Sequence, residues 1–175
     1  PQLILSTWLG AHDFPQDTNK SEYIESLISE QLPLVVDNDL ANWVDVFCEP
    51  GWYDLEQTET IIQASHELGL RSRIHVDEFV DGSGLSLAAE LGCDSGDHVG
   101  FSNSESREAA SKAGTLQTFL PGTPYVLGEK LNYPISKIIL EGPEDQLLLT
   151  KNTQPAILTV SYSIFKVLND EFGFD

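Results

Sequence analysis

Methionine is absent from these 175 residues, and the chain opens on Pro1. Because translation starts at methionine, we expect the sequence to be a processed or cut piece of a longer chain. Basic residues are scarce: 9 lysines and arginines stand against 28 aspartates and glutamates, which gives a net charge of −19. A field of this sign repels nucleic-acid phosphates and anionic membrane surfaces, so we expect neither as a partner.

Cysteines and long apolar runs are also scarce. Cys48 and Cys93 are the only cysteines, and their spacing is not that of a metal site, so we expect reduced thiols and a cytoplasmic location. No run of about 18 apolar residues occurs, and no basic segment precedes an apolar one near the start. The sequence therefore predicts neither a membrane span nor an export signal. Its 41% hydrophobic and 21% charged residues are typical of a globular domain.

Apolar runs alternate with helical patterns through the first three quarters of the chain. Each run is followed by a polar loop and then by a segment of helical periodicity. The helix after the second run shows both end signals, since Asp54 with Gln57 predicts a capping box and Gly69 predicts its end. Further helices are expected at 18–31, at 85–92, and from a cap at Ser102 or Ser104 to Gly114. The expected strands are 3–12, 43–51, 71–79, 96–101 and 115–122.

Strands that alternate with helices at this spacing predict an α/β fold with a parallel sheet. A doubly wound sheet and a (β/α)8 barrel both fit the alternation. The absence of a glycine-rich phosphate loop favours a barrel, or part of one. The alternation fails after about residue 133, so we divide the chain into a partial barrel, 1–132, and a divergent segment, 133–175, to which we assign neither fold nor chemistry.

Polar residues stand where the expected strands end. They are His12, Glu49, His75, Glu78 and His98. In parallel α/β folds the carboxyl ends of the strands form the edge where active sites are built. We therefore expect these side chains to lie near one another.

His75 and Glu78, in "RIHVDE", permit two interpretations. One is a strand-end histidine followed by a solvated acidic loop. The other is a metal ligand with a carboxylate that moves protons nearby, because zinc and iron bind a neutral imidazole nitrogen and lower the pKa of a bound water. Asp77 alternates to the other side of the strand, and we interpret it as structural. His98 and His12 end other strands of the same sheet and are expected within reach of the same pocket.

Five segments resemble the imidazolonepropionase family of metal-dependent amidohydrolases in order and spacing. They are "STWLGAH", "VDVFCEPG", "RIHVDEF", "LAAELGCDSGDHV" and "AGTLQTFLPGTPYVL". The resemblance covers residues 3–132 and implies a TIM barrel of which this chain supplies about strands three to seven. It implies a hydrolase of histidine degradation that opens the ring of 4-imidazolone-5-propanoate to N-formimino-glutamate by means of a metal-activated water.

The resemblance also implies a role for each histidine and for one glutamate. His75 would bind one divalent ion, zinc or iron. Glu78 would activate the water. His98 would contact the substrate and help to polarise its carbonyl, and His12 would bind the substrate.

Two departures from the family pattern bear on metal binding. No His-x-His pair occurs, and Lys151 in "LLLTKNTQP" stands where the family has an aspartate ligand. We therefore expect weak or absent metal binding and no measurable hydrolysis by this chain alone. A non-catalytic remnant and a different amidohydrolase or deaminase remain alternative interpretations. Because a partial barrel exposes sheet edges and strand faces, we also expect a homodimer or a companion segment.

Overall fold

The computed structural model describes residues 5–120 of the chain. Residues 5–118 belong to one compact unit, Pro1–Thr118, and the last two described residues belong to a second unit, Phe119–Asp175. The boundary expected at 132 and the position of Lys151 both lie outside the described residues. None of the helices within 5–120 is long and apolar enough to cross a membrane.

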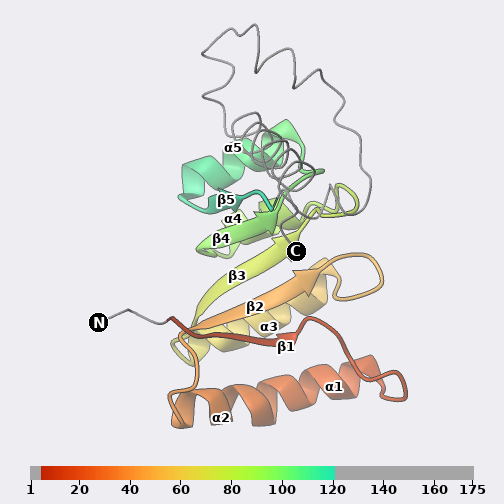
Figure 1. The fold of residues 1–175 in the computed structure, drawn as a ribbon, viewed down its shortest axis with the longest axis vertical. Helices are drawn as coiled ribbons and strands as arrows, with labels where there is room; N and C mark the ends of the chain where they lie inside the picture. Colours follow the sequence, from red (N-terminus) through yellow and green to blue (C-terminus); the bar gives the residue numbers. More distant parts are fainter. Residues whose placement is uncertain (1–4, 121–175) are drawn as a thin grey trace, which may run out of the picture. The chain divides into compact units, whose positions relative to one another are not determined.

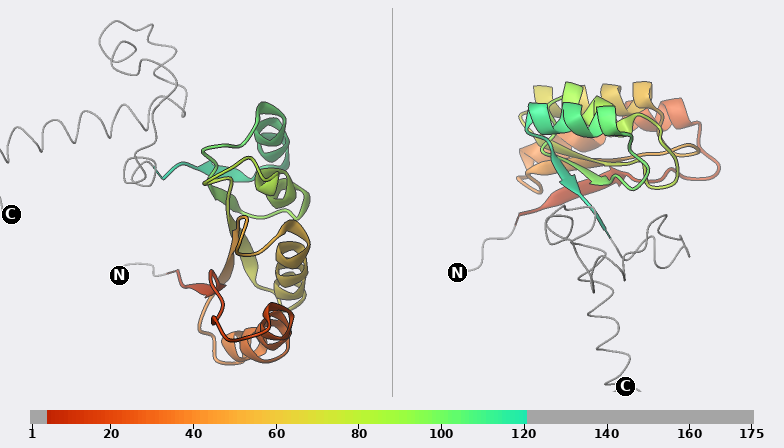
Figure 2. Two further views of the ribbon diagram at one scale, coloured as in Figure 1. Left: turned by 90° about the vertical axis from the view of Figure 1, so that its right-hand side faces the viewer. Right: turned by 90° about the horizontal axis from the view of Figure 1, so that it is seen from above.

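Five parallel strands form one sheet, and they lie side by side in the order in which they occur in the sequence (Figure 1). They are β1 (Thr7–Ala11), β2 (Trp43–Cys48), β3 (Arg71–Val76), β4 (Ser95–His98) and β5 (Leu116–Thr118). The helices lie along one face of the sheet (Figure 2). This confirms the predicted parallel α/β fold. A doubly wound sheet carries helices on both faces, so the arrangement is compatible with part of a barrel.

The first helical segment is longer than the sequence predicted. Asn19 caps it by accepting hydrogen bonds from the backbone of Ser21 and Glu22, and it continues past the expected end at Gln31. Pro33 has no N–H to donate to the preceding turn, and a π-helical turn directly before it carries the chain through without a break. Its three parts are α1 (Lys20–Ser26), η1 (Leu27–Gln31) and α2 (Leu32–Asp37).

The remaining helices follow the sequence signals more closely. The capping box of Asp54 and Gln57 is present at the start of α3 (Leu55–Glu67). After α4 (Gly84–Glu90), helix α5 (Ser104–Ala113) ends at Gly114 in the left-handed conformation, as predicted. The cap of α5 was predicted wrongly. Asn103, not a serine, accepts the hydrogen bond from the backbone of Ser106.

The core lies between the sheet and the helices. Alternate residues of β2 and β3, namely Val44, Val46, Ile74 and Val76, point to the helices and are fully buried. They belong to one apolar cluster with Ile61 of α3. Burial of each such side chain stabilises the fold by about 1.5–3 kcal/mol. The core therefore fixes the strands and, with them, every residue that points to the opposite face.

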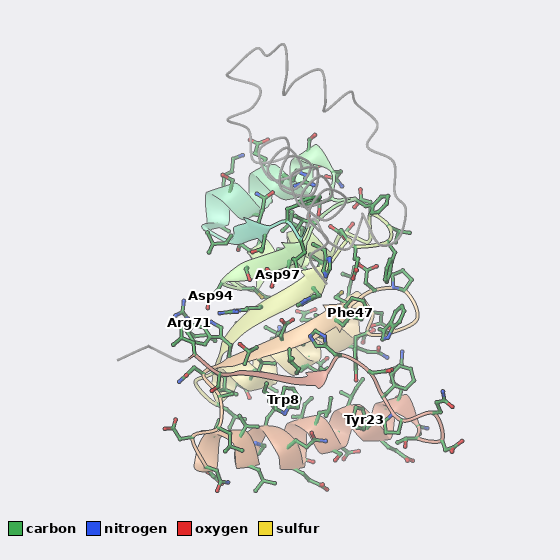
Figure 3. All side chains as sticks on the ribbon, in the orientation of Figure 1. Trp8, Tyr23, Phe47, Arg71, Asp94 and Asp97 are labelled. Atoms are coloured by element: carbon green, nitrogen blue, oxygen red, sulfur yellow. The ribbon has the colours of Figure 1, made fainter. Side chains whose placement is uncertain are left out.

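The opposite face of the sheet carries polar and aromatic side chains. Because strand residues alternate, Asp45 and Phe47 of β2 and Arg73 and His75 of β3 share this face. Within 5–120, no helix covers it (Figure 2). At the N-terminal end of the strands, a guanidinium nitrogen of Arg71 lies 2.6 Å from an oxygen of Asp94 (Figure 3). In parallel barrels, residues at the N-terminal ends of the strands commonly serve stability. We therefore expect the candidate chemistry at the C-terminal ends of the strands.

Candidate active site

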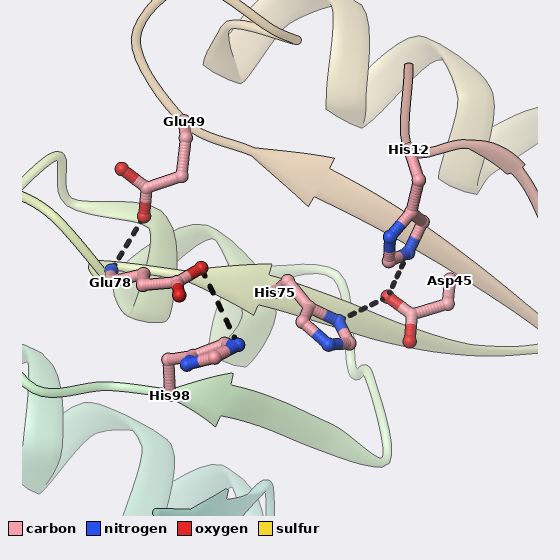
Figure 4. A network of polar contacts seen from close by, with 6 residues as sticks. All are labelled: His12, Asp45, Glu49, His75, Glu78 and His98. Atoms are coloured by element: carbon pink, nitrogen blue, oxygen red, sulfur yellow. Dashed lines mark hydrogen bonds and ion pairs between the residues drawn. The ribbon is translucent and has the colours of Figure 1, made fainter. Parts of the chain in front are cut away.

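Four side chains singled out in the sequence lie together at the C-terminal edge of the sheet (Figure 4). His75 lies in β3 and His98 ends β4, whereas His12 directly follows β1 and Glu78 is the second residue after β3. The ring centroid of His75 lies 4.8 Å from that of His12 and 5.1 Å from that of His98. A carboxylate oxygen of Glu78 lies 3.4 Å from Nε2 of His98. The sheet edge thus gathers all four residues.

The ring of His75 is turned away from the core. Its neighbours Ile74 and Val76 are buried under the helices, whereas His75 is partly exposed on the opposite face. Nδ1 of His75 lies 2.8 Å from Oδ1 of Asp45. Because a carboxylate oxygen only accepts, Nδ1 carries the proton in this contact, and the neutral ring keeps its lone pair on Nε2. Nε2 is therefore the ring nitrogen left for a ligand.

Asp45 ties together two of the histidines. It is 4% exposed, and its Oδ1 also lies 3.2 Å from Nε2 of His12. Burial alone would raise the pKa of Asp45, but the contacts with His12 and His75 outweigh burial and lower that pKa. Burial would likewise lower the pKa of His75, but the hydrogen bond to Asp45 and its charge raise it. The pair therefore favours an ionised carboxylate beside a basic imidazole.

No role was predicted for Asp45 from the sequence. A signal was present, because Asp45 is the one charged residue of the buried strand "WVDVFC", and a buried carboxylate requires a partner. The partner itself depends on the register of β2 with β3, in which Phe47 lies beside His75. Register of this kind is not visible in the sequence.

His12 lies at the rim of the cluster. Its Nε2 is buried and forms no well-aligned hydrogen bond within residues 5–120, although it lies close to Asp45. The ring stacks on Phe47, with centroids 5.9 Å apart and planes 18° apart. His12 also lines an open hollow of about 430 Å³, together with Phe14 and Tyr23 among others. His12 therefore faces both the cluster and an accessible space.

His98 and Glu78 form the second half of the cluster. Burial, together with the charge of His75, lowers the pKa of His98 to about 4. The ring is thus neutral near pH 7 beside the Glu78 carboxylate. His98 and Val99 have φ values of 73° and 48°, a left-handed conformation that is rare for residues other than glycine. The backbone N–H of Val99 donates to the carbonyl of Val76, which holds this turn against β3.

Glu49 lies directly after β2 and is 3% exposed. Its Oε1 accepts a hydrogen bond of 2.6 Å from the backbone N–H of Glu78. Burial raises the pKa of Glu49 to about 7, with a further increase from the negative charge of Asp77. This polar residue, like the histidines, was expected at the sheet edge from its place in the sequence.

Asp77 is structural, as the sequence predicted. Its carboxylate accepts hydrogen bonds from the backbone of Gly82, Gly84 and Leu85 and from the hydroxyl of Ser102. It therefore fixes the loop that follows β3. The cysteines are not part of the chemistry either, since both are free and buried, and burial raises their thiol pKa values to about 11.

Three of the clustered residues fit a metal ion. One donor atom each from His12, Asp45 and His75 lies within 4.8 Å of the others. Imidazole nitrogens with a carboxylate oxygen are donors that zinc and iron accept. The buried Nε2 of His12, with no aligned hydrogen bond among the described residues, is consistent with such a site. The structure thus gathers the residues of the predicted site and adds Asp45, whereas the individual roles stay predictions.

Comparison with known proteins gives the family. No protein-family model matches the chain. The chain is 42% identical over 126 residues to the imidazolonepropionase of Caldanaerobacter subterraneus, covering 71% of this chain and 30% of that protein. It is 39% identical over 129 residues to that of Halobacterium salinarum, covering 74% of this chain and 31% of that protein.

A longer match is found with the imidazolonepropionase of Shewanella woodyi, at 35% identity over 162 residues. This match covers 91% of the chain and 37% of that protein. The chain therefore spans about a third of the length of the curated relatives that it matches. At these identities, and with most of the chain aligned, it belongs to the imidazolonepropionase family.

Proposed function

We propose that this chain contributes the central part of an imidazolonepropionase active site. The activity would be hydrolytic opening of the ring of 4-imidazolone-5-propanoate to N-formimino-glutamate. The observation that carries the proposal is the convergence of His75, Glu78 and His98 at one sheet edge in a chain of this family. The sheet would be about strands three to seven of a (β/α)8 barrel, which its strand order and one-sided helices support.

Glu78 and His98 would carry the proton transfers. Water attacks the ring carbonyl, and the amide C–N bond of the ring breaks. Glu78 takes the proton from the attacking water and returns it to the leaving nitrogen. His98, neutral because burial holds its pKa at about 4, donates its N–H towards the substrate carbonyl and so stabilises the negative charge that develops on oxygen.

His75 would hold one divalent ion, zinc or iron, through the ring nitrogen that Asp45 leaves free. When bound, such an ion polarises a carbonyl and lowers the pKa of a coordinated water. A carboxylate that accepts the other N–H of a ligating histidine fixes the ring and raises its basicity. Because the described donor set is small, and because Lys151 replaces the expected aspartate in the sequence, we propose that the isolated chain binds the ion weakly.

His12 would bind the substrate. Its position beside an open hollow and its stacked contact with Phe47 favour contact with a flat ring. Its closeness to Asp45 gives it a second possible role, as a metal donor. A metal titration of His12 and His75 variants separates these roles.

The net charge and the family support proposals for the partners and the location of the chain. We propose a small-molecule substrate and a cytoplasmic location, with neither nucleic acid nor membrane as a partner. The charge of −19 supports the exclusion of phosphate-bearing partners. We also propose a homodimer, supported by the sheet face that no helix covers within residues 5–120.

A chimera tests the proposed function. The segment of the Caldanaerobacter subterraneus relative that aligns with this chain is replaced by the matching residues of this chain. We expect metal-dependent hydrolysis, followed by the ultraviolet absorbance of the imidazolone ring, and no measurable hydrolysis by the 175-residue chain alone. A folded chimera with normal metal content and no turnover would contradict the proposal. Hydrolysis by the chain alone that a chelator stops would contradict the proposed weak metal binding.

A further inference from the structure

A buried carboxylate holds the backbone from which the proposed catalytic carboxylate projects. Oε1 of Glu49 lies 2.6 Å from the backbone nitrogen of Glu78, and the Glu78 carboxylate in turn lies 3.4 Å from Nε2 of His98. Figure 4 shows the three residues in a row, with Glu49 on the far side of Glu78 from His98. Glu49 thus contacts the residue that is proposed to move protons, without reaching the histidines.

The turn that carries Glu78 is anchored at two points. Asp77 has a φ of 52°, a left-handed conformation that aspartate adopts occasionally and only as a single residue. Its side chain accepts hydrogen bonds from the backbone of the loop residues Gly82 and Gly84. Glu49 holds the backbone of Glu78. With both anchors in place, the Cα of Glu78 is fixed, and its side chain is directed to His98.

Stability alone does not explain a glutamate at position 49. Its Oε2 is buried and makes no well-aligned hydrogen bond within residues 5–120, although the backbone N–H of Phe79 helps to lower the pKa of the carboxyl. Incomplete hydrogen bonding is unfavourable for a buried polar atom. Asp77 and Glu78 add negative charge nearby. Buried polar groups whose hydrogen bonding is incomplete concentrate at functional sites.

We propose that Glu49 is a positioning residue that fixes the Glu78 carboxylate beside His98. The inference rests on the proposed role of Glu78 in hydrolysis. Glu49 acts through the backbone of Glu78 and does not contact the reacting atoms. Loss of its acceptor oxygen should therefore misplace Glu78 while leaving substrate binding intact.

Four variants of the 175-residue chain test the proposal. Glu49→Leu removes the acceptor, and Glu49→Asp retracts it by one methylene while keeping the charge. Glu49→Gln keeps the carbonyl acceptor. Glu67→Leu, at an exposed position at the end of α3, is the matched surface control. Hydrogen exchange of the Glu78 amide and the ¹⁵N shift of the His98 ring are measured by NMR, with the amide of Ile74 as an internal reference in β3.

In Glu49→Leu and Glu49→Asp, exchange at Glu78 should quicken by about tenfold and the His98 ring shift should move. Exchange at Ile74 should stay unchanged. In Glu49→Gln and Glu67→Leu, the ratio of the Glu78 exchange rate to the Ile74 exchange rate and the His98 ring shift should resemble those of the parent. Two results overturn the proposal. One is an unchanged Glu78 exchange rate and an unchanged His98 ring shift in both Glu49→Leu and Glu49→Asp. The other is an increase in the exchange rate of Ile74 as large as that of Glu78, which would make Glu49 a general stabiliser.

Hydrolysis is measured in the chimera with the Caldanaerobacter subterraneus relative. Glu49→Leu and Glu49→Asp should lower kcat by about tenfold or more with KM unchanged, and Glu49→Gln should keep kcat near that of the parent. A rise in KM with kcat unchanged would contradict positioning of Glu78. If the parent chimera has no turnover, the proposed function fails, whereas the NMR measurements still decide the role of Glu49.

Discussion

Replacement of Glu49 by glutamine should stabilise the chain, and the gain should grow with pH. Burial raises the pKa of Glu49 from 4.5 to about 7. An acid with a higher pKa in the folded state contributes stability that is fully present below its unfolded pKa. That contribution is lost as the pH rises through the folded-state pKa. Glutamine has no proton to lose, so the variant escapes this loss while keeping an acceptor for the Glu78 N–H.

The magnitude follows from the two pKa values. Their difference corresponds to a penalty of about 3.4 kcal/mol once the pH is well above 7. At pH 5, where unfolded Glu49 is mostly ionised and folded Glu49 is mostly protonated, the penalty is about 0.8 kcal/mol. At pH 8 it is about 3.3 kcal/mol. The advantage of Glu49→Gln in free energy of unfolding should therefore grow by about 2.5 kcal/mol between pH 5 and pH 8.

Urea unfolding measured by tryptophan fluorescence provides the assay. The chain has three tryptophans, Trp8, Trp43 and Trp52, and all lie within residues 5–120. Parent and variant are compared from pH 5 to pH 8 at one ionic strength, with Glu67→Gln as an exposed control. The reasoning is refuted if the difference between parent and Glu49→Gln stays constant across this range, or if it shrinks as the pH rises.

Other predictions address the proposed site. In the chimera, Glu78→Gln should abolish turnover and leave metal content, measured by elemental analysis, near that of the parent; loss of both would make Glu78 a ligand. In the 175-residue chain, His75→Ala should weaken zinc binding by at least about tenfold in competition with a chromophoric chelator. His12→Gln should leave zinc binding unchanged, and an equal loss would assign His12 to the metal. Asp45→Leu should lower the free energy of unfolding by about 2 kcal/mol and release the proton from Nδ1 of His75, so an unchanged ¹⁵N spectrum of that ring would contradict the assigned contact.

The sequence was most informative where the chemistry is local. Apolar runs that alternate with helical patterns predicted the parallel sheet, because each unit of strand and helix carries its own periodicity. The capping box at Asp54 was predicted for the same reason, since both partners lie within one helical turn. The gathering of His75 and His98 at one edge followed from parallel topology alone, in which all strands end on the same side.

Features that depend on neighbours distant in the sequence were not predictable. Asp45 pairs with His75, 30 residues away, and the pairing follows from the register of β2 with β3. Ser102 was one of the two serines expected to cap a helix, but its hydroxyl donates to Asp77, 25 residues earlier, and Asn103 caps the helix instead. The continuation of the first helix through Pro33 depends on a π-helical turn, which leaves no periodic signal.

The one-sided cover of the sheet separates two kinds of selection along each strand. In β3, Ile74 and Val76 pack under the helices, whereas Arg73 and His75 face away from them. Substitutions at the first pair act on folding, and substitutions at the second pair act mainly on whatever the open face binds. The face can therefore diverge in chemistry, residue by residue, over a core that stays unchanged. A lineage of such chains should record this as two interleaved rates of sequence change within a single strand.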